Sequence, residues 1–258
     1  MPAIYAHYKM GRDSIKNLNP KNQEIINKYR DLYDLGLQGA DFLFFNFKDV
    51  TIKSELLATK IHYEPCRNSL NRMVRAGIDE ASLSYILGFI GHFAMDSKMH
   101  PLINSLSKIG VQHHRLEMEF DKKLMHEDGI EIGAFNMKTL VPNDQYTKKV
   151  VASVYSKFDI SKRKIKSSVD MMHNMKDFLY IDNDKRYKRL KIIMKMMGIY
   201  KKFGGHLLYN DKNQYDYLMK DMTYYYKQAK DIYPLLVEDF CNHIDDLNFS
   251  PYFNRTFE

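Results

Sequence analysis

The sequence predicts an all-α protein, a single compact helical domain spanning residues 1–258 with about nine or ten helices. Apolar residues recur at helical spacing along much of the chain, for example Leu190, Ile193, Met194 and Met197. Prolines and glycines divide this pattern into pieces of helix length. No internal repeat, Ser/Gly-rich linker or low-complexity tract separates one part from another. At 258 residues the chain lies at the upper end of single-domain size.

The elements of the first half are bounded by local signals. Pro20 is suited to open a helix, and the residue before Pro101 is disfavoured in the α region, so a helix should end there. The aromatic run 41–45 has no neighbouring partner strand, and we expect a buried turn or short helix. The predicted helices cover residues 3–17, 21–36, 54–76, 79–99 and 109–126.

The second half should add about four more helices. Residues 127–142 form the longest irregular stretch, because Gly129 and Gly133 break any periodic pattern. The following region, 144–251, is again helical in pattern. Its last apolar stripe is interrupted at Pro234 and consists of Met222, Tyr226, Ala229, Tyr233, Leu236 and Phe240.

Composition limits the class of protein. The net charge of +7 comes from scattered lysines, which indicates a basic solvated surface and makes nucleic acid a less favoured partner. Two cysteines, Cys66 and Cys241, are too few for a disulfide framework, and we expect reduced thiols. The N-terminal residues lack the basic and apolar regions of a signal peptide, and no apolar run approaches the roughly 20 residues of a membrane span. We therefore expect a cytoplasmic protein.

Two pairs of residues have the spacing of a metal site. His92 and Asp96 lie four residues apart, as do His113 and Glu117. On a helix this spacing places both side chains of a pair on one face. Imidazole nitrogen and carboxylate oxygen are ligands that zinc accepts. The alternative is two amphipathic helices whose histidines are paired with local carboxylates, but two such pairs close together favour a metal.

The sequence offers more candidate ligands than a single zinc ion would use. Six of the ten histidines lie in the first 114 residues, and Asp41 stands among hydrophobic neighbours, where an unpaired carboxylate would be costly. A single catalytic zinc needs only three protein ligands. We therefore expect two or three zinc ions, with Asp96 placed to bridge. His114 competes with His113 for the same role. The candidate ligands are His7, Asp41, His62, His92, Asp96, His100, His113 and Glu117.

These residues resemble the zinc-dependent phospholipases C over residues 2–121. The segments Pro2–Tyr8 and Leu37–Phe45 are similar to the cytoplasmic branch of that family. The motifs occur in the family's order: Ala6-His7-Tyr8, Gly39-Ala40-Asp41, Ile61-His62-Tyr63, His92-x-x-x-Asp96, His100 and His113-x-x-x-Glu117.

The resemblance implies an all-α fold and a set of zinc ligands. Asp41, His62, His92 and Asp96 would hold one ion, and His100, His113 and Glu117 a second. His7 would share Asp96 at a third. In secreted members an N-terminal tryptophan completes this third site, whereas the present chain contains no tryptophan. The interval from Asp96 to His100 is also shorter than in those enzymes.

The implied activity is phosphodiester hydrolysis that releases diacylglycerol and a phosphorylated headgroup. Asp41 would serve as general base, and Phe42 and Tyr63 could line the substrate cleft. One alternative is a zinc nuclease or another phosphodiesterase with a similar centre. Another is a non-catalytic, zinc-stabilised relative that binds lipid or a partner protein.

A basic surface would suit peripheral contact with an anionic membrane. Several lysines could contribute to such contact, although a solvated helix face is the simpler interpretation. These lysines are Lys188, Lys191, Lys195, Lys201 and Lys202.

Overall fold

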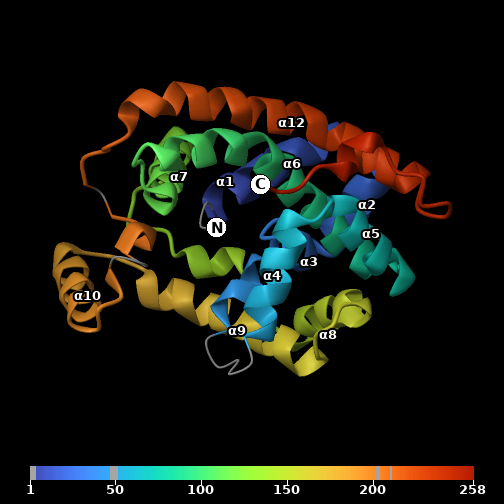
Figure 1. Cartoon of the computed structure of the whole chain (residues 1–258), viewed down its shortest axis with the longest axis horizontal. Coiled ribbons are helices and arrows are strands. Elements are labelled where there is room, and N and C mark those ends of the chain that lie inside the picture. Colours follow the sequence, from blue (N-terminus) through green and yellow to red (C-terminus); the bar gives the residue numbers. More distant parts are fainter. Residues whose placement is uncertain (1–3, 47–51, 201–203, 210) are drawn as a thin grey trace.

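The computed structural model describes residues 4–46, 52–200, 204–209 and 211–258, and within these ranges it contains helices and no β-strand. The all-α prediction is thereby confirmed. Figure 1 shows the helices gathered around a central one, α6. Eleven α-helices lie in the described ranges: α1 (Ile4–Ser14), α2 (Pro20–Lys28), α3 (Arg30–Gly36), α4 (Lys53–Tyr63), α5 (Cys66–Arg75), α6 (Glu80–Lys108), α7 (His113–Glu127), α8 (Gln145–Val154), α9 (Lys162–Leu179), α10 (Asp184–Met196) and α12 (Met219–Asn242).

The 29-residue helix α6 is the core element, and α3 and α12 pack along it. It starts at a capping box, in which the Asp79 side chain accepts from the Ser82 backbone and the Ser82 hydroxyl accepts from the Asp79 backbone, both at 2.8 Å. The prediction that it ends before Pro101 is wrong. Proline removes one helical hydrogen bond, but the next turns remain anchored because Ile103 is buried.

Two predicted helices are each divided in two. The segment 21–36 breaks at Tyr29, whose φ of −123° and ψ of 48° are not helical. The segment 54–76 breaks at Glu64, which is extended because Pro65 follows it. By contrast, Pro20 opens α2 and residues Asp41–Phe45 form a short 3₁₀ helix, η2, as predicted.

Helices α3 and α6 touch through their backbones. A Cβ at Gly36 would lie 2.2 Å from the Tyr85 carbonyl oxygen, and one at Gly88 would lie 2.2 Å from that of Tyr33. Only glycine permits this approach. It brings the turn after α3, and with it η2, against the middle of α6.

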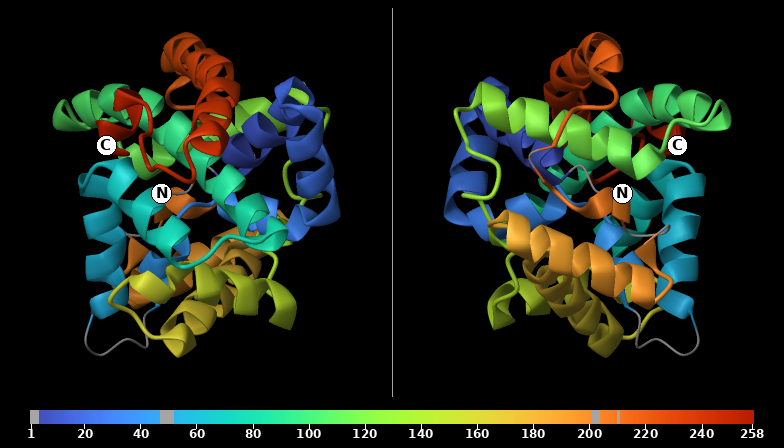
Figure 2. Two further views of the ribbon diagram at one scale, coloured as in Figure 1. Left: turned by 90° about the vertical axis from the view of Figure 1, so that its right-hand side faces the viewer. Right: turned by 90° about the vertical axis from the view of Figure 1, so that its left-hand side faces the viewer.

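The second half covers opposite sides of this core. Figure 2 shows α12 (orange to red) on one side of the molecule and α8 and α9 (yellow to gold) on the other. Helix α12 continues through Pro234, and the whole apolar stripe from Met222 to Phe240 is buried. On α10 only Leu190 and Met194 of the expected stripe are buried, in a small separate cluster.

No helix in the described ranges combines the length and apolar character that crossing a bilayer requires. Cys66 and Cys241 are both free thiols, in keeping with the expectation of reduced cysteines.

Candidate metal centre

The eight candidate ligands lie together, and they form three groups in which the potential ligand atoms are within 4.8 Å of one another. Two of the groups share His92. They are His7, His92 and Asp96; Asp41, His62 and His92; and His100, His113 and Glu117.

The second of these groups joins three separate elements. Asp41 is the first residue of η2, His62 lies in the last turn of α4, and His92 lies in the middle of α6. His62 Nε2 lies 3.0 Å from Asp41 Oδ1, and His92 Nε2 lies 3.8 Å from the same oxygen. All three side chains are buried. Two imidazoles therefore converge on one carboxylate oxygen.

Asp96 lies between the groups. One of its oxygens, Oδ2, is 3.1 Å from His92 Nε2, and the other, Oδ1, is 3.3 Å from His7 Nε2 on α1. His100 Nε2 is 3.8 Å from Oδ1 as well. Asp96 therefore faces three imidazoles, and its role as a bridging ligand stays a prediction from the sequence.

The third group joins the end of α6 to the start of α7. Glu117 Oε1 lies 3.2 Å from His113 Nε2 and 3.5 Å from His100 Nε2. His114 Nδ1 lies 3.6 Å from the other carboxylate oxygen, and its ring stacks on His206 with centroids 4.5 Å apart. His113 therefore faces His100 within the group, whereas His114 lies beside it.

Two of the histidines are oriented by backbone carbonyls. His62 Nδ1 donates to the carbonyl of Ala58, and His100 Nδ1 donates to that of Phe257, both at 2.8 Å. A carbonyl can only accept, so Nδ1 carries a proton, and Nε2, which faces the carboxylates, is the nitrogen available to a metal. Metal-ligating histidines are held in this way.

The charge state also suits a metal. Burial opposes ionisation of Asp96, yet the neighbouring His100, His92 and His7 hold its pKa well below the ordinary value. Burial likewise opposes ionisation of Glu117, but His113 and His100, which face its carboxylate, hold its pKa well below the ordinary value. Both carboxylates are therefore ionised at neutral pH, as ligation requires.

Several buried polar atoms of the site make no well-aligned hydrogen bond to the described part of the chain. They are His7 Nδ1, Asp41 Oδ1, His92 Nδ1 and His92 Nε2. Unsatisfied groups of this kind are costly in a protein interior. A donor set of imidazole and carboxylate without thiolate fits zinc, and coordination would satisfy Asp41 Oδ1 and His92 Nε2.

The family model of zinc-dependent phospholipase C matches residues 6–175. The chain belongs to this family. The matched region contains all eight candidate ligands, so zinc is the metal that the family implies for these groups. Neither the curated proteins nor the solved structures gave a significant match to the chain.

In this member of the zinc-dependent phospholipase C family, the motif Gly39-Ala40-Asp41 begins with glycine for a steric reason. Its φ is +58°, and a Cβ built there would lie 2.1 Å from Cδ2 of His92. The turn before Asp41 passes directly over the His92 ring, and only glycine leaves room for both.

Two residues that support the site were not foreseen from the sequence. Asp121, one turn after Glu117 on α7, accepts hydrogen bonds from the backbone N–H groups of Tyr5 (3.2 Å) and Ala6 (2.8 Å). It therefore fixes the start of α1 beside His7. The spacing rule that found Glu117 could have found Asp121, which continues the same face four residues later.

Phe257 is the second such residue. Its N–H donates to the His62 carbonyl at 3.1 Å, and its ring contacts those of His62 and His92 at centroid distances of 5.3 and 5.7 Å. Its own carbonyl is the acceptor for His100. No local pattern connects a phenylalanine with histidines more than 150 residues earlier.

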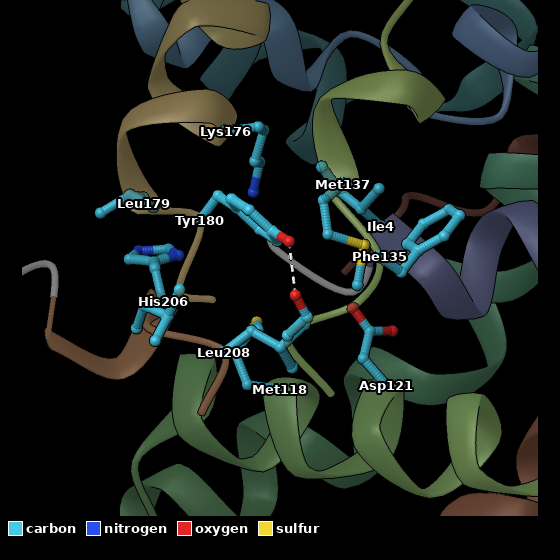
Figure 3. Close-up of a pocket in the computed structure, with 12 residues that line it drawn as sticks. Ile4, Met118, Asp121, Phe135, Met137, Lys176, Leu179, Tyr180, His206 and Leu208 are labelled. Carbon is cyan, nitrogen blue, oxygen red and sulfur yellow. Dashed lines mark hydrogen bonds between the residues drawn. The ribbon is translucent and has the colours of Figure 1, made fainter. Parts of the chain in front are cut away.

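A small pocket, partly open to solvent, lies beside Asp121. Figure 3 shows Lys176 reaching into it from α9, opposite Met118 and Asp121 of α7. The two aromatic residues predicted to line the substrate cleft do not line this pocket. Phe42 is fully buried against Tyr155, and Tyr63 is 66% exposed at the end of α4.

Proposed function

We propose that the protein is a phospholipase C that acts at a centre of two or three zinc ions. The observation that carries this proposal is the convergence of three His/carboxylate groups, two of which share His92, in a chain of the zinc-dependent phospholipase C family. The products would be diacylglycerol and a phosphorylated headgroup. The number of ions, the lipid substrate and the ligand roles are parts of the proposal.

The ligands can be assigned to three ions, with Asp96 shared between two of them. Asp41, His62, His92 and Asp96 would hold one ion, His100, His113 and Glu117 a second, and His7 with Asp96 a third. Bound zinc lowers the pKa of water to about 7 and polarises phosphoryl oxygens.

The residues of the chain supply orientation and proton transfer. Asp41 would accept the proton of the attacking water through Oδ2, the carboxylate oxygen left free when Oδ1 binds the ion. The water oxygen then forms a bond to phosphorus, the bond from phosphorus to the glycerol oxygen breaks, and that oxygen takes up the proton that Asp41 had accepted. Burial of Asp41 and His92 excludes other water from the reacting atoms.

The test is hydrolysis of phosphatidylcholine and of anionic phospholipid by the zinc-loaded chain. Asp41→Asn keeps the shape but not the basicity, and should lower turnover by roughly 10²–10⁴-fold. His92→Ala should lose zinc as well. His243→Ala is the matched control, because this histidine is paired with Asp246 away from the clusters. Full activity of the metal-depleted His92→Ala protein would contradict the proposal.

Two other functions use the same groups. A zinc nuclease would cleave single-stranded DNA and a simple nucleotide diester in preference to lipid, and a non-catalytic relative would bind zinc without turning over any of them. Assays of all three substrates on one zinc-loaded preparation separate these outcomes. Family membership favours the lipid.

The substrate also implies a surface that meets an anionic membrane. Helix α10 carries six cationic side chains and one carboxylate. Its outer face holds Ile192 and Met196, four residues apart, which are 58% and 83% exposed. Lys188 and Lys195 are exposed on the same helix, whereas Lys201 and Lys202 lie outside the described residues. An apolar line flanked by cations is suited to the interface of an anionic bilayer.

Vesicle sedimentation tests this surface without reference to catalysis. Vesicles with phosphatidylserine should bind the protein, and vesicles of phosphatidylcholine alone should bind it more weakly. Replacing both Ile192 and Met196 by serine should weaken binding about tenfold or more, since burial of each contributes over 1 kcal/mol. Leu235→Ser on α12, at 62% exposure, is the control. Equal binding of both variants would contradict the assignment.

A further inference from the structure

Lys176 is a buried cation at the edge of the metal centre. It lies in the last turn of α9 and is 7% exposed. Its Nζ lies 5.5 Å from the centroid of the Phe45 ring in η2. No ion pair or hydrogen bond joins Nζ to any residue in the described ranges. A buried ammonium in this state is costly and needs a partner.

The position of Lys176 relates it to two of the ligand groups. Helix α9 packs on η2, the segment that begins with Asp41. The opposite wall of the pocket is α7, where Met118 and Asp121 follow Glu117. Burial lowers the pKa of Lys176 to about 8, while the charges of Asp121, Asp41 and Glu117 favour its cationic form. The ammonium therefore lies between segments that carry ligands of separate groups.

The ligands themselves do not require this cation once metal is bound. Asp41, Asp96 and Glu117 together carry three negative charges, and two zinc ions would carry four positive ones. Lys176 then adds positive charge to a centre that already has an excess. Such an arrangement is suited to an anion that enters from outside the protein.

We propose that Lys176 binds a non-bridging phosphate oxygen of the ligand. The walls around Lys176 combine apolar side chains with few polar ones, and include Ile4, Met118, Leu179 and Leu208. This suits a phosphate ester better than a free polyanion. The inference rests on the proposed function for its substrate class, but its test uses inorganic phosphate and needs no turnover.

The test compares phosphate binding by zinc-loaded full-length variants with calorimetry, alongside elemental analysis of zinc. Lys176→Met should weaken phosphate binding at least about tenfold with the zinc content unchanged. Lys176→Arg keeps the charge and should bind within a few-fold of the original protein. The control is Lys148→Met, because Lys148 is equally buried but is paired with Asp170 at 2.6 Å.

A purely structural role gives different results. Unchanged phosphate binding by Lys176→Met would overturn the inference, and so would a loss of zinc that accounts for the loss of phosphate. Should Lys176→Met fail to fold, the original protein still provides a measurement. Phosphate should slow acetylation of Lys176, followed by mass spectrometry, and an unaltered rate at saturating phosphate would overturn the inference.

The result is separable from that of the proposed function. Phosphate binding that depends on Lys176 in a protein that hydrolyses no phospholipid would support this inference and refute the activity. Phospholipid hydrolysis with phosphate binding that is independent of Lys176 would support the proposed activity and refute this inference.

Discussion

The backbone carbonyl of Phe257 lies 2.8 Å from Nδ1 of His100, so the C-terminal segment sets the orientation of a candidate metal ligand on α6. The ring of Phe257 also contacts His62 and His92. One residue thus supports histidines from all three ligand groups.

Removing the Phe257 ring should therefore affect zinc binding as well as stability. Phe257→Ala should lower the free energy of unfolding by about 3–5 kcal/mol. It should also weaken zinc binding by roughly 10–100-fold, the usual effect of losing support behind ligands. Denaturant titration and competition with a chelator measure the two effects. Phe249→Ala is the control, because Phe249 is equally buried but packs on Phe240 and Phe253. Equal zinc affinity in both variants would show that Phe257 only fills the core.

Gly39 provides a test of the turn over His92. Gly39→Ala should reduce zinc content, since its Cβ would lie 2.1 Å from Cδ2 of that ring. Gly77→Ala is the matched control: φ there is +92°, and nothing lies within 4 Å of the added atom. Both variants bear a backbone cost of about 1–2 kcal/mol for a positive φ. Only Gly39→Ala should lose metal in elemental analysis. An equal loss of metal in Gly77→Ala would mean that backbone strain, and not the contact with His92, causes the loss.

Asp121 should affect zinc binding at His7 and leave zinc binding at the other ligand groups unchanged. Asp121→Ala removes the acceptor for the N–H groups of Tyr5 and Ala6, so the start of α1 loses its anchor. We expect weaker binding of the ion shared by His7 and Asp96, with the remaining zinc retained. Asp121→Asn keeps one amide oxygen as acceptor and should lie between the two. Stepwise chelation followed by a zinc indicator resolves the sites. Loss of all zinc together would contradict a local role.

Asp128 should make stability depend on acid pH. Burial opposes ionisation, but hydrogen bonds from Lys9, Tyr5 and Arg12 lower its pKa to about 2. The unfolded value is about 3.9, so the stabilisation is complete above about pH 5 and disappears as pH falls from about 4 to 2. It amounts to about 2 kcal/mol. Denaturant titrations of the original protein and Asp128→Asn should differ by this amount at pH 7 and converge near pH 2. A constant difference would contradict the assignment.

The sequence was sufficient for the parts of the site that depend on local spacing. Four-residue intervals on helices predicted that His92 would meet Asp96 and that His113 would meet Glu117, and both contacts are present. The cost of an unpaired buried carboxylate also pointed to Asp41.

The ends of helices were harder to predict from the sequence, because they depend on how each helix packs in the core. Pro101 lies inside α6, where the surrounding core compensates for one lost hydrogen bond, whereas Pro65 divides a helix as its local preference requires. The roles of Phe257 and Lys176 depend on contacts between distant segments. No periodicity or spacing within the chain encodes such contacts.

The central claim is a polynuclear zinc centre built from three neighbouring ligand groups, two of which share His92. Elemental analysis of the purified, dialysed protein tests it most directly. The account predicts two or three zinc ions per chain, with a reduced number in His92→Ala because that residue belongs to two groups. One zinc ion per chain, or none, in the original protein would contradict it.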